Sequence, residues 1–391
     1  MNAENAPDRD DENPILPFPY RHPLELPVAE PWPTPVHAAG LLDWIRDLIN
    51  KYVVCPPHAP EMLALWTLHT YAFHLRNVTT YLGVVSPERR CGKTTLLRLL
   101  GMMANRALLA SNISSPAVFR TVEEAQPTLI MDELDTFLKG NSELRGILNA
   151  GYTRDSAYVV RVEGRGSRKY RTEGSKGSEG KPQKSQLVKF SCWCPKVMSG
   201  IGRLPETLAD RCIMITMQRK TKEERCERLR NPDTTELRQK CVRFVQDNAE
   251  KIARWEPKIP ECLNDRAADV WEPLLVLAEL AGGEWPERAR TAAEALSGVR
   301  QPMGPTAVLL VHIKLLFETT KCDRLFTRTI VQALNQFDAI KEMRAGKGLT
   351  EVWLSRQLSS YGVESRAIWI GEECAKGYYA EDLRAVFERY L

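Results

Sequence analysis

Apolar side chains recur at helical spacing in residues 41–53, and residues 61–75 are apolar on almost every side of a helix. The first pattern predicts an amphipathic helix and the second a buried one. His69 and His74 lie in the second segment. We interpret both as core or flanking residues rather than as ligands.

Between residues 78 and 218 the spacing of apolar residues changes, and short apolar runs typical of strands alternate with helical segments. Helices are predicted at 94–105 and from about Ser115, and the apolar runs are TTYLGVV, ALLAS, PTLIMDELD, QLVKFSCWC and RCIMITM. Strands that alternate with helices form parallel sheets covered by those helices. We therefore expect an α/β fold on a parallel sheet, whose third strand ends in acidic residues.

The remaining chain is predicted to be mainly helical. Residues 221–300 look helical throughout, and a Gly pair at 282–283 suits a left-handed helix end. Beyond Gly304, the pattern indicates helices near 306–319, 327–337 and 349–362, a hairpin at 366–379 and a last helix at 380–391. Three helices with a two-stranded ribbon resemble a winged helix, a module that binds nucleic acids or proteins. Arg356 and Arg366 would be its exposed basic groups.

Composition separates the start of the chain from the rest. Residues 1–35 hold nine of the 25 prolines and seven acidic against two basic residues, which predicts a disordered arm. We expect this arm at 1–35, N-terminal helices at 36–77, a sheet core at 78–220, a helical lid at 221–303 and a winged-helix-like domain at 304–391.

Charge and cysteine content exclude several classes of protein. The net charge of +4 is too small to indicate a partner by itself. Ten irregularly spaced cysteines and six histidines favour reduced thiols over a disulfide framework or zinc. We interpret Cys192 and Cys194 as buried residues on one face of a strand, not as metal or redox groups. No apolar run approaches the roughly 18 residues that span a bilayer, and the acidic start is unlike a signal peptide, so we expect a cytoplasmic protein.

The stretch SPERRCGKTT, residues 86–95, lies between a predicted strand and a predicted helix. A phosphate-binding loop needs backbone N–H groups at a helix start, a lysine for the phosphates and a hydroxyl for Mg²⁺, which Gly92, Lys93 and Thr94 supply. Proline at position 87 replaces the first glycine of G-x-x-x-x-G-K-[ST] and lacks an N–H donor, so the loop must enter by another turn. A chance match is the alternative. The expected nucleotide-binding residues are Ser86, Glu88, Arg89, Arg90, Cys91, Gly92, Lys93, Thr94 and Thr95.

Two further stretches strengthen this interpretation. In MDELD, at the end of the third strand, Asp132 is expected to hold Mg²⁺ with Thr94, and Glu133 to polarise the attacking water. A solvated acidic helix start is the alternative. Arg211 precedes the last strand, where an arginine can stabilise a γ-phosphate held by a neighbouring subunit. The alternative is a surface arginine paired with Asp210 or Glu206.

The motifs together resemble a family of prophage- and plasmid-borne P-loop ATPases of unknown function. The stretches that carry the resemblance are SPERRCGKTTLL, PTLIMDELDTFL, NSELRGILNAGYTR, PKVMSGIGRLPETLADR, DRAADVWEPLL and KGYYAEDL. The resemblance implies an AAA+-like core of the superfamily 3 helicase kind, with Arg211 acting across a ring interface. It also implies ATP and Mg²⁺ as cofactors, a ring-forming homo-oligomer such as a hexamer, and DNA and replication proteins as partners. In such ATPases the sensor residue after the fourth strand is commonly Asn, and Cys194 and Ser199 are the candidates here.

Residues 161–189 carry nine Lys or Arg against three Glu and form the one concentrated basic stretch. Ring helicases of this kind place a hairpin here, and its cations can pair with phosphates without reading bases. The candidates for nucleic-acid contact are Arg165, Arg168, Lys169, Arg171 and Lys176. A flexible, merely solvated Gly, Ser and Lys loop is the alternative.

Three hypotheses for function remain open from the sequence. The first is a Mg²⁺-dependent ATPase that couples turnover to nucleic-acid remodelling or translocation, with catalytic residues Lys93, Asp132, Glu133 and Arg211. The second is an ATP-gated switch or helicase loader that recruits a protein partner and hydrolyses slowly. The third is a small-metabolite kinase, which the adjacent carboxylates Asp132 and Glu133 disfavour because they suit activation of water.

Overall fold

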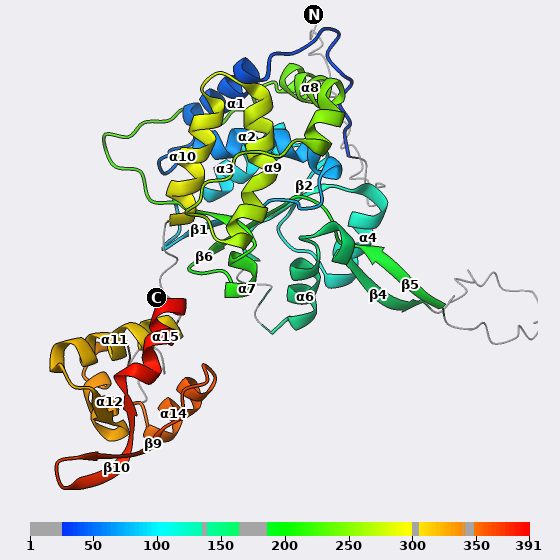
Figure 1. Cartoon of the computed structure of the whole chain (residues 1–391). Coiled ribbons are helices and arrows are strands. Elements are labelled where there is room, and N and C mark those ends of the chain that lie inside the picture. Colours follow the sequence, from blue (N-terminus) through cyan, green and yellow to red (C-terminus); the bar gives the residue numbers. More distant parts are fainter. Residues whose placement is uncertain are drawn as a thin grey trace, which may run out of the picture. The chain divides into compact units, whose positions relative to one another are not determined.

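The computed structural model describes residues 26–134, 138, 140–163, 186–298, 305–338, 340 and 348–391. The chain divides into two compact units, one through Ser297 and one from Gly298 onward (Figure 1). Each unit has its own hydrophobic core. No helix in the described part of the chain is long and apolar enough to cross a membrane. The finer five-part division expected from the sequence stays a prediction.

A five-stranded parallel sheet forms the centre of the first unit, which confirms the predicted α/β class. Its strands are β1 (Tyr81–Ser86), β2 (Ala107–Ala110), β3 (Thr128–Met131), β6 (Lys196–Ile201) and β7 (Cys212–Thr216). Their order across the sheet is β2-β3-β6-β1-β7. Strand β1 therefore lies between β6 and β7, and β6 separates it from β3. This layout is consistent with a P-loop-like core.

The predicted fourth strand was wrong. QLVKFSCWC supplies β5 (Gln186–Ser191), which pairs antiparallel with β4 (Tyr158–Glu163) in a separate hairpin, whereas the strand in the sheet is the later KVMSGI. QLVKFS alternates because one side of the hairpin is exposed, while β6 is almost wholly buried and shows no alternation. Cys192 and Cys194 follow β5 and lie in no strand, but both are fully buried as predicted. Burial raises the pKa of the Cys192 thiol to about 11.

Helices surround the sheet, and the two N-terminal helices add to the core of this unit. Around the strands lie α3 (Lys93–Met103), α4 (Ser115–Ala125), α6 (Ser142–Ala150) and the short α7 (Glu206–Ala209). The predicted N-terminal helices are α1 (Ala38–Tyr52) and α2 (Ala59–Ala72), and α2 is buried on nearly every side. The ring of His69 accepts a hydrogen bond from the Thr80 amide, and burial lowers its pKa to about 3. His69 is thus a neutral core residue in this structure.

Residues 221–300 are not helical throughout. The helices are α8 (Thr235–Arg254), α9 (Asp265–Ala281) and α10 (Trp285–Gly298), and residues 217–234 form an irregular segment. That segment is rich in helix-forming charged residues, but it is exposed and lacks an apolar face whose packing would stabilise a helix. Helices α8 and α9 pack on α2. Gly282 and Gly283 both have positive φ after α9, but the C-cap Gly282 has ψ −161° and is therefore not in the left-handed helical conformation.

A buried lysine fixes the start of β6. The Lys196 ammonium donates to the Tyr81 hydroxyl at 2.9 Å and to the carbonyls of Cys192 and Cys194 at 2.7 and 3.1 Å. Gly151 lies against this cluster, since a Cβ there would be 2.2 Å from the Cys192 carbonyl oxygen. Only glycine allows this close approach.

We expect Gly151→Ala to lower the free energy of unfolding by about 1–3 kcal/mol, the usual cost of overpacking a well-packed site. Urea denaturation followed by circular dichroism measures the change. Gly146→Ala is the control because, among the described residues, nothing beyond its chain neighbours and its own helix backbone lies within 4 Å of its Cβ position in helix α6. That change should stabilise by about 0.5–1 kcal/mol. An equal effect of the two substitutions would contradict the packing argument.

The second unit combines helices with a small antiparallel sheet. Its elements are α11 (Pro305–Thr320), β8 (Arg324–Phe326), α12 (Thr327–Leu334), α14 (Glu351–Ser359), β9 (Arg366–Ile370), β10 (Glu373–Tyr379) and α15 (Ala380–Tyr390). The expected hairpin is β9–β10, and β8 adds a third strand on the other side of β10, which the sequence interpretation missed. The assignment as a winged helix stays a prediction.

Candidate functional site

The stretch SPERRCGKTT contains a loop that joins a buried strand to a helix. Strand β1 ends at Ser86 and α3 begins at Lys93, with Gly92 as its N-cap at φ 82°. Glycine adopts this left-handed conformation without the penalty that a Cβ brings. The first amide groups of α3 lack partners within the helix and face the loop. An anion is therefore favoured at this position.

Side chains close the loop where proline replaces glycine. The Ser86 hydroxyl donates to the Glu88 carbonyl at 2.6 Å, and the Cys91 thiol donates to the same carbonyl at 3.3 Å. The Lys93 ammonium donates to the Ser86 hydroxyl. Pro87 thus enters a turn held by Ser86 and Cys91 rather than by backbone groups of a first glycine.

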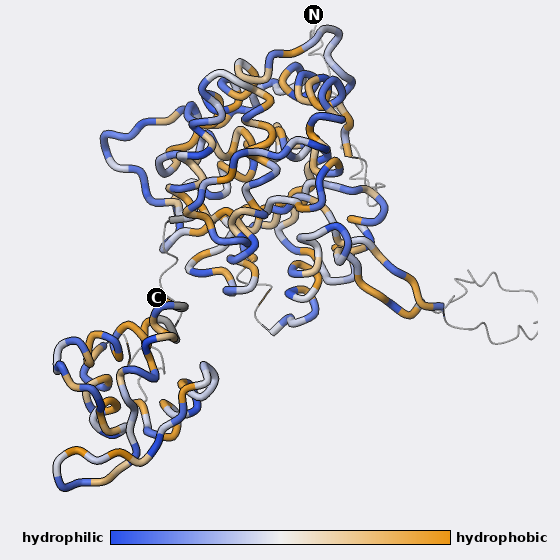
Figure 2. Tube along the Cα trace, in the orientation of Figure 1, coloured by the Kyte–Doolittle hydropathy of each residue, from blue (hydrophilic) through white to orange (hydrophobic). Residues whose placement is uncertain are grey.

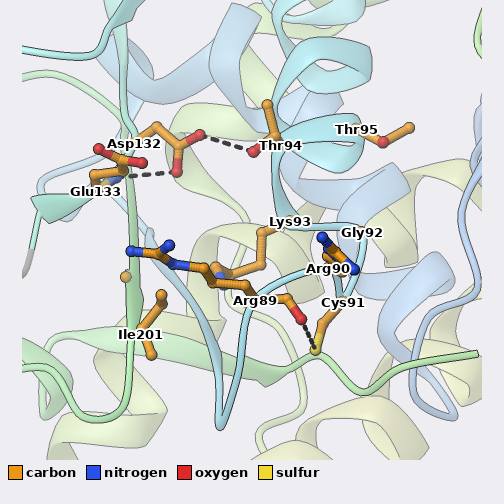
Figure 3. A pocket seen from close by; sticks show the side chains of 11 residues that line it. Arg89, Arg90, Cys91, Gly92, Lys93, Thr94, Thr95, Asp132, Glu133 and Ile201 are labelled. Atoms are coloured by element: carbon orange, nitrogen blue, oxygen red, sulfur yellow. Dashed lines mark hydrogen bonds between the residues drawn. The ribbon is translucent and has the colours of Figure 1, made fainter.

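A cavity of about 350 Å³ lies over the loop (Figure 3). Two of its lining residues, Arg90 and Glu133, have positive φ values of 67° and 54° although neither is glycine. Backbone strain of this kind gathers at ligand sites, where the surrounding structure holds it in place. The lining consists of Arg89, Arg90, Cys91, Gly92, Lys93, Thr94, Thr95, Asp132, Glu133, Gly200 and Ile201.

Asp132 is the centre of a hydrogen-bond network on one side of this cavity. Its carboxylate accepts from the Thr94 hydroxyl at 3.0 Å (Figure 3). It also accepts from the Ser199 hydroxyl at 3.0 Å. The Glu133 amide donates to the same carboxylate at 3.0 Å. A carboxylate beside a threonine hydroxyl supplies the hard oxygen ligands that Mg²⁺ prefers. Thr94 and Asp132 are close enough to share one ion.

Of the two candidates for the sensor position, only Ser199 contacts a residue that lines the cavity. Ser199 lies within β6, next to β3, and bonds directly to Asp132. Cys194 precedes β6 at the opposite end of the strand, where its carbonyl accepts from the buried Lys196. The sequence left this choice open because the register of the true fourth strand was unknown.

A second cavity of about 220 Å³ adjoins the first. The two share Arg90, Cys91, Gly92 and Thr95, so they meet at the phosphate-binding loop. The remaining lining residues are Tyr52, Val53, Val54, Gln218, Lys220 and Cys226. Sequence reasoning missed these residues, because the end of α1 and the segment after β7 meet the loop only in the folded chain.

Arg211 lies at the other end of the sheet from the loop. Cys212, the next residue, pairs with Tyr81 at the start of β1, whereas the loop follows Ser86 at its end. Five strand residues separate these ends by roughly 17 Å. The guanidinium donates to the Thr207 carbonyl, while Asp210 pairs instead with Arg266 at 3.3 Å. Arg211 therefore does not belong to the cavity of its own chain.

The remaining basic candidates lie elsewhere. Arg165, Arg168, Lys169, Arg171 and Lys176 fall outside the described residues, in the segment that joins β4 to β5. In the second unit, Arg366 is exposed, as expected, and it pairs with Asp382 at 2.9 Å, which partly compensates its charge. Arg356 is exposed on α14, as expected.

Comparison with known proteins gives partial matches. Residues 216–390 match a family described as a protein of unknown function (DUF3631). A protein of Saccharopolyspora erythraea, the uncharacterized 28.9 kDa protein in the xis 5′ region, is 32% identical over 161 residues. This match covers 40% of the chain and 60% of that relative.

Among solved structures, the A form apo structure of the NrS-1 C-terminal region aligns with 92% of this chain and 78% of its own, at 14% identity and a TM-score of 0.37. Cdc6p from Pyrobaculum aerophilum aligns with 88% of this chain and 97% of its own, at 12% identity and a TM-score of 0.21. These TM-scores are too low for either likeness to support an inference about this chain.

Proposed function

We propose that the protein is a Mg²⁺-dependent ATPase that couples hydrolysis to the remodelling or translocation of nucleic acid. The observation that carries this proposal is the hydrogen bond from Thr94 to Asp132 at the start of α3. This bond brings the hydroxyl of Thr94, on α3, next to the carboxylate of Asp132, which follows β3. Both groups lie beside the start of α3, where an anion is favoured. Thr94 and Asp132 would hold Mg²⁺, which would stabilise the charge that develops on the phosphates, and Glu133 would activate water.

The two adjoining cavities suit the two ends of a nucleotide. The larger holds Lys93 and both carboxylates and would take the phosphates with Mg²⁺. The smaller is lined by Tyr52, Val53 and Val54, whose apolar surfaces suit a flat nucleobase. The loop residues shared by both cavities would then lie beneath the sugar and the first phosphate.

Hydrolysis would require a second copy of the chain. Arg211 is roughly 17 Å from its own loop along the sheet, so it would reach only a nucleotide held by a neighbour. This arrangement supports a ring-forming homo-oligomer in which each site is completed by the next subunit.

The β4–β5 hairpin supports the nucleic-acid part of the proposal. Figure 2 shows hydrophobic residues along both strands as they extend away from the sheet. Tyr158, Val160, Val162 and Leu187 are between 42% and 71% exposed, and the Lys189 ammonium lies 4.2 Å from the centre of the Tyr158 ring. An exposed aromatic ring beside a cation suits base stacking and phosphate contact. The segment that joins the strands is the basic stretch of the sequence.

A second candidate function is an ATP-gated switch or loader, and the second unit favours it. Its basic residues Arg324, Arg328 and Arg366 pair with acidic neighbours, which weakens their attraction for phosphates. Trp369 on β9 is 62% exposed, and an exposed tryptophan suits a protein contact.

Phosphate release from Mg·ATP, with and without single- and double-stranded DNA, distinguishes the two functions. Stimulation by DNA supports the ATPase, and bound but unhydrolysed ATP supports the switch.

We expect Lys93→Ala to weaken Mg·ATP binding by about 10- to 150-fold, because a charge-assisted hydrogen bond to phosphate contributes about 1.5–3 kcal/mol. Isothermal titration calorimetry of the full chain measures the affinity. Lys314→Ala, an exposed site on α11 in the other unit, should leave it unchanged. Unaltered binding by Lys93→Ala would remove the loop from the proposed site.

A further inference from the structure

Two consecutive arginines in the phosphate-binding loop have uncompensated side chains. Arg89 and Arg90 are both exposed, and within the described part of the chain no carboxylate pairs with either. The acidic residue beside them, Glu88, pairs instead with Arg219 at 2.7 Å. Two free cations next to the start of α3 strengthen its attraction for an anion.

The two arginines occupy different parts of the site. Arg90 lines both cavities, which places it where they meet, whereas Arg89 lines only the larger one. Figure 3 shows Arg89 extending toward Ile201 on the side of the carboxylates, while Arg90 lies beside Gly92. Arg89 therefore points to the end of the site that would hold the outermost phosphate.

The backbone that carries Arg89 is anchored from outside the loop. The Arg219 guanidinium donates through Nε to the Arg89 carbonyl at 3.3 Å and pairs with the preceding residue, Glu88. Arg219 lies in the irregular segment after β7. These two contacts hold the backbone at Glu88 and Arg89 and leave the Arg89 side chain free to line the larger cavity.

We propose that Arg89 binds the γ-phosphate of the nucleotide held by its own chain. This inference rests on the proposed function. A guanidinium presents parallel N–H donors that match two phosphate oxygens, and it stays charged at every relevant pH. The site then carries two cations of its own for the terminal phosphates, Lys93 and Arg89, before a neighbouring subunit contributes Arg211. A single chain would thus distinguish a nucleoside triphosphate from a diphosphate without a neighbour.

The test is calorimetric titration of the full chain with Mg·AMPPNP, a non-hydrolysable triphosphate, and separately with Mg·ADP. Arg89→Ala should weaken Mg·AMPPNP binding by about 10- to 150-fold, the range for a charge-assisted hydrogen bond to phosphate, and Mg·ADP binding by less than about threefold. Arg89→Lys should restore part of the loss. Arg90→Ala is the matched control and should weaken both ligands by the same factor, because Arg90 lies where the cavities meet.

The outcomes separate this inference from the proposed function. A selective loss of Mg·AMPPNP affinity in Arg89→Ala supports the contact with the γ-phosphate, and retained Mg·ADP binding shows that the variant is folded. Equal losses for the two ligands, or no loss, overturn it and leave the ATPase proposal intact. Failure of the unaltered protein to bind either nucleotide would overturn both.

Discussion

Arg211→Ala should lower the rate of ATP hydrolysis by about 10³- to 10⁵-fold, the range known for arginines that stabilise charge on a transferred phosphoryl group. Nucleotide affinity should stay within about twofold, because Arg211 lies at the opposite end of β1 from the loop of its own chain. Phosphate release and calorimetric titration measure the two quantities separately. Arg203→Ala, an exposed arginine between β6 and α7, is the matched control.

A mixing experiment tests whether Arg211 acts on a neighbour. Subunits with Lys93→Ala lack the loop lysine but keep Arg211, whereas subunits with Arg211→Ala have the reverse defect. Mixed oligomers should regain part of the lost hydrolysis, because some sites then combine an intact loop with an intact arginine. Full activity of Arg211→Ala alone, or no recovery on mixing, would contradict a role across the interface.

Glu133→Gln should lower the rate of hydrolysis by about 10²- to 10⁴-fold, the contribution of a positioned general base. The amide keeps the shape of the side chain but cannot accept a proton from water. ATP binding should be retained, since Asp132 and Thr94 remain to hold Mg²⁺. Single-turnover phosphate release measures the chemical step, with Glu124→Gln on the exposed face of α4 as the control.

The result for Glu133 also separates the open hypotheses. Hydrolysis that survives Glu133→Gln would assign the attacking water to another base. Formation of ADP only when a small acceptor molecule is supplied would favour a kinase instead. If the unaltered protein binds ATP and hydrolyses none, alone or with DNA, the switch hypothesis becomes the better account.

Much of the first unit was predictable because its signals are local. The run from 79 to 105 changes from a strand period to a helical one around GKT, and the structure places β1, the loop and α3 there. The parallel sheet followed from the same alternation. The fourth strand of the sheet could not be predicted in this way, because β6 is buried and its sequence does not alternate. The exposed hairpin strand β5 does alternate, so its sequence resembles that of a sheet strand. The composition of the segment after β7 predicts a helix, because its charged residues favour one, but the structure is irregular there.

The sequence by itself determined which residues lie in the loop and which acids end the third strand, since neighbours along the chain fix both. It did not determine which distant groups meet them. Strand order brings Ser199 onto Asp132, and the direction of β7 leaves Arg211 at the end of the sheet opposite the loop. Chain folding brings Tyr52 and Cys226 to one cavity. These pairings depend on the register of β6 and on the path of the segment after β7. Both are set by burial of the whole core, to which many residues contribute a little each, so no short stretch of sequence encodes them.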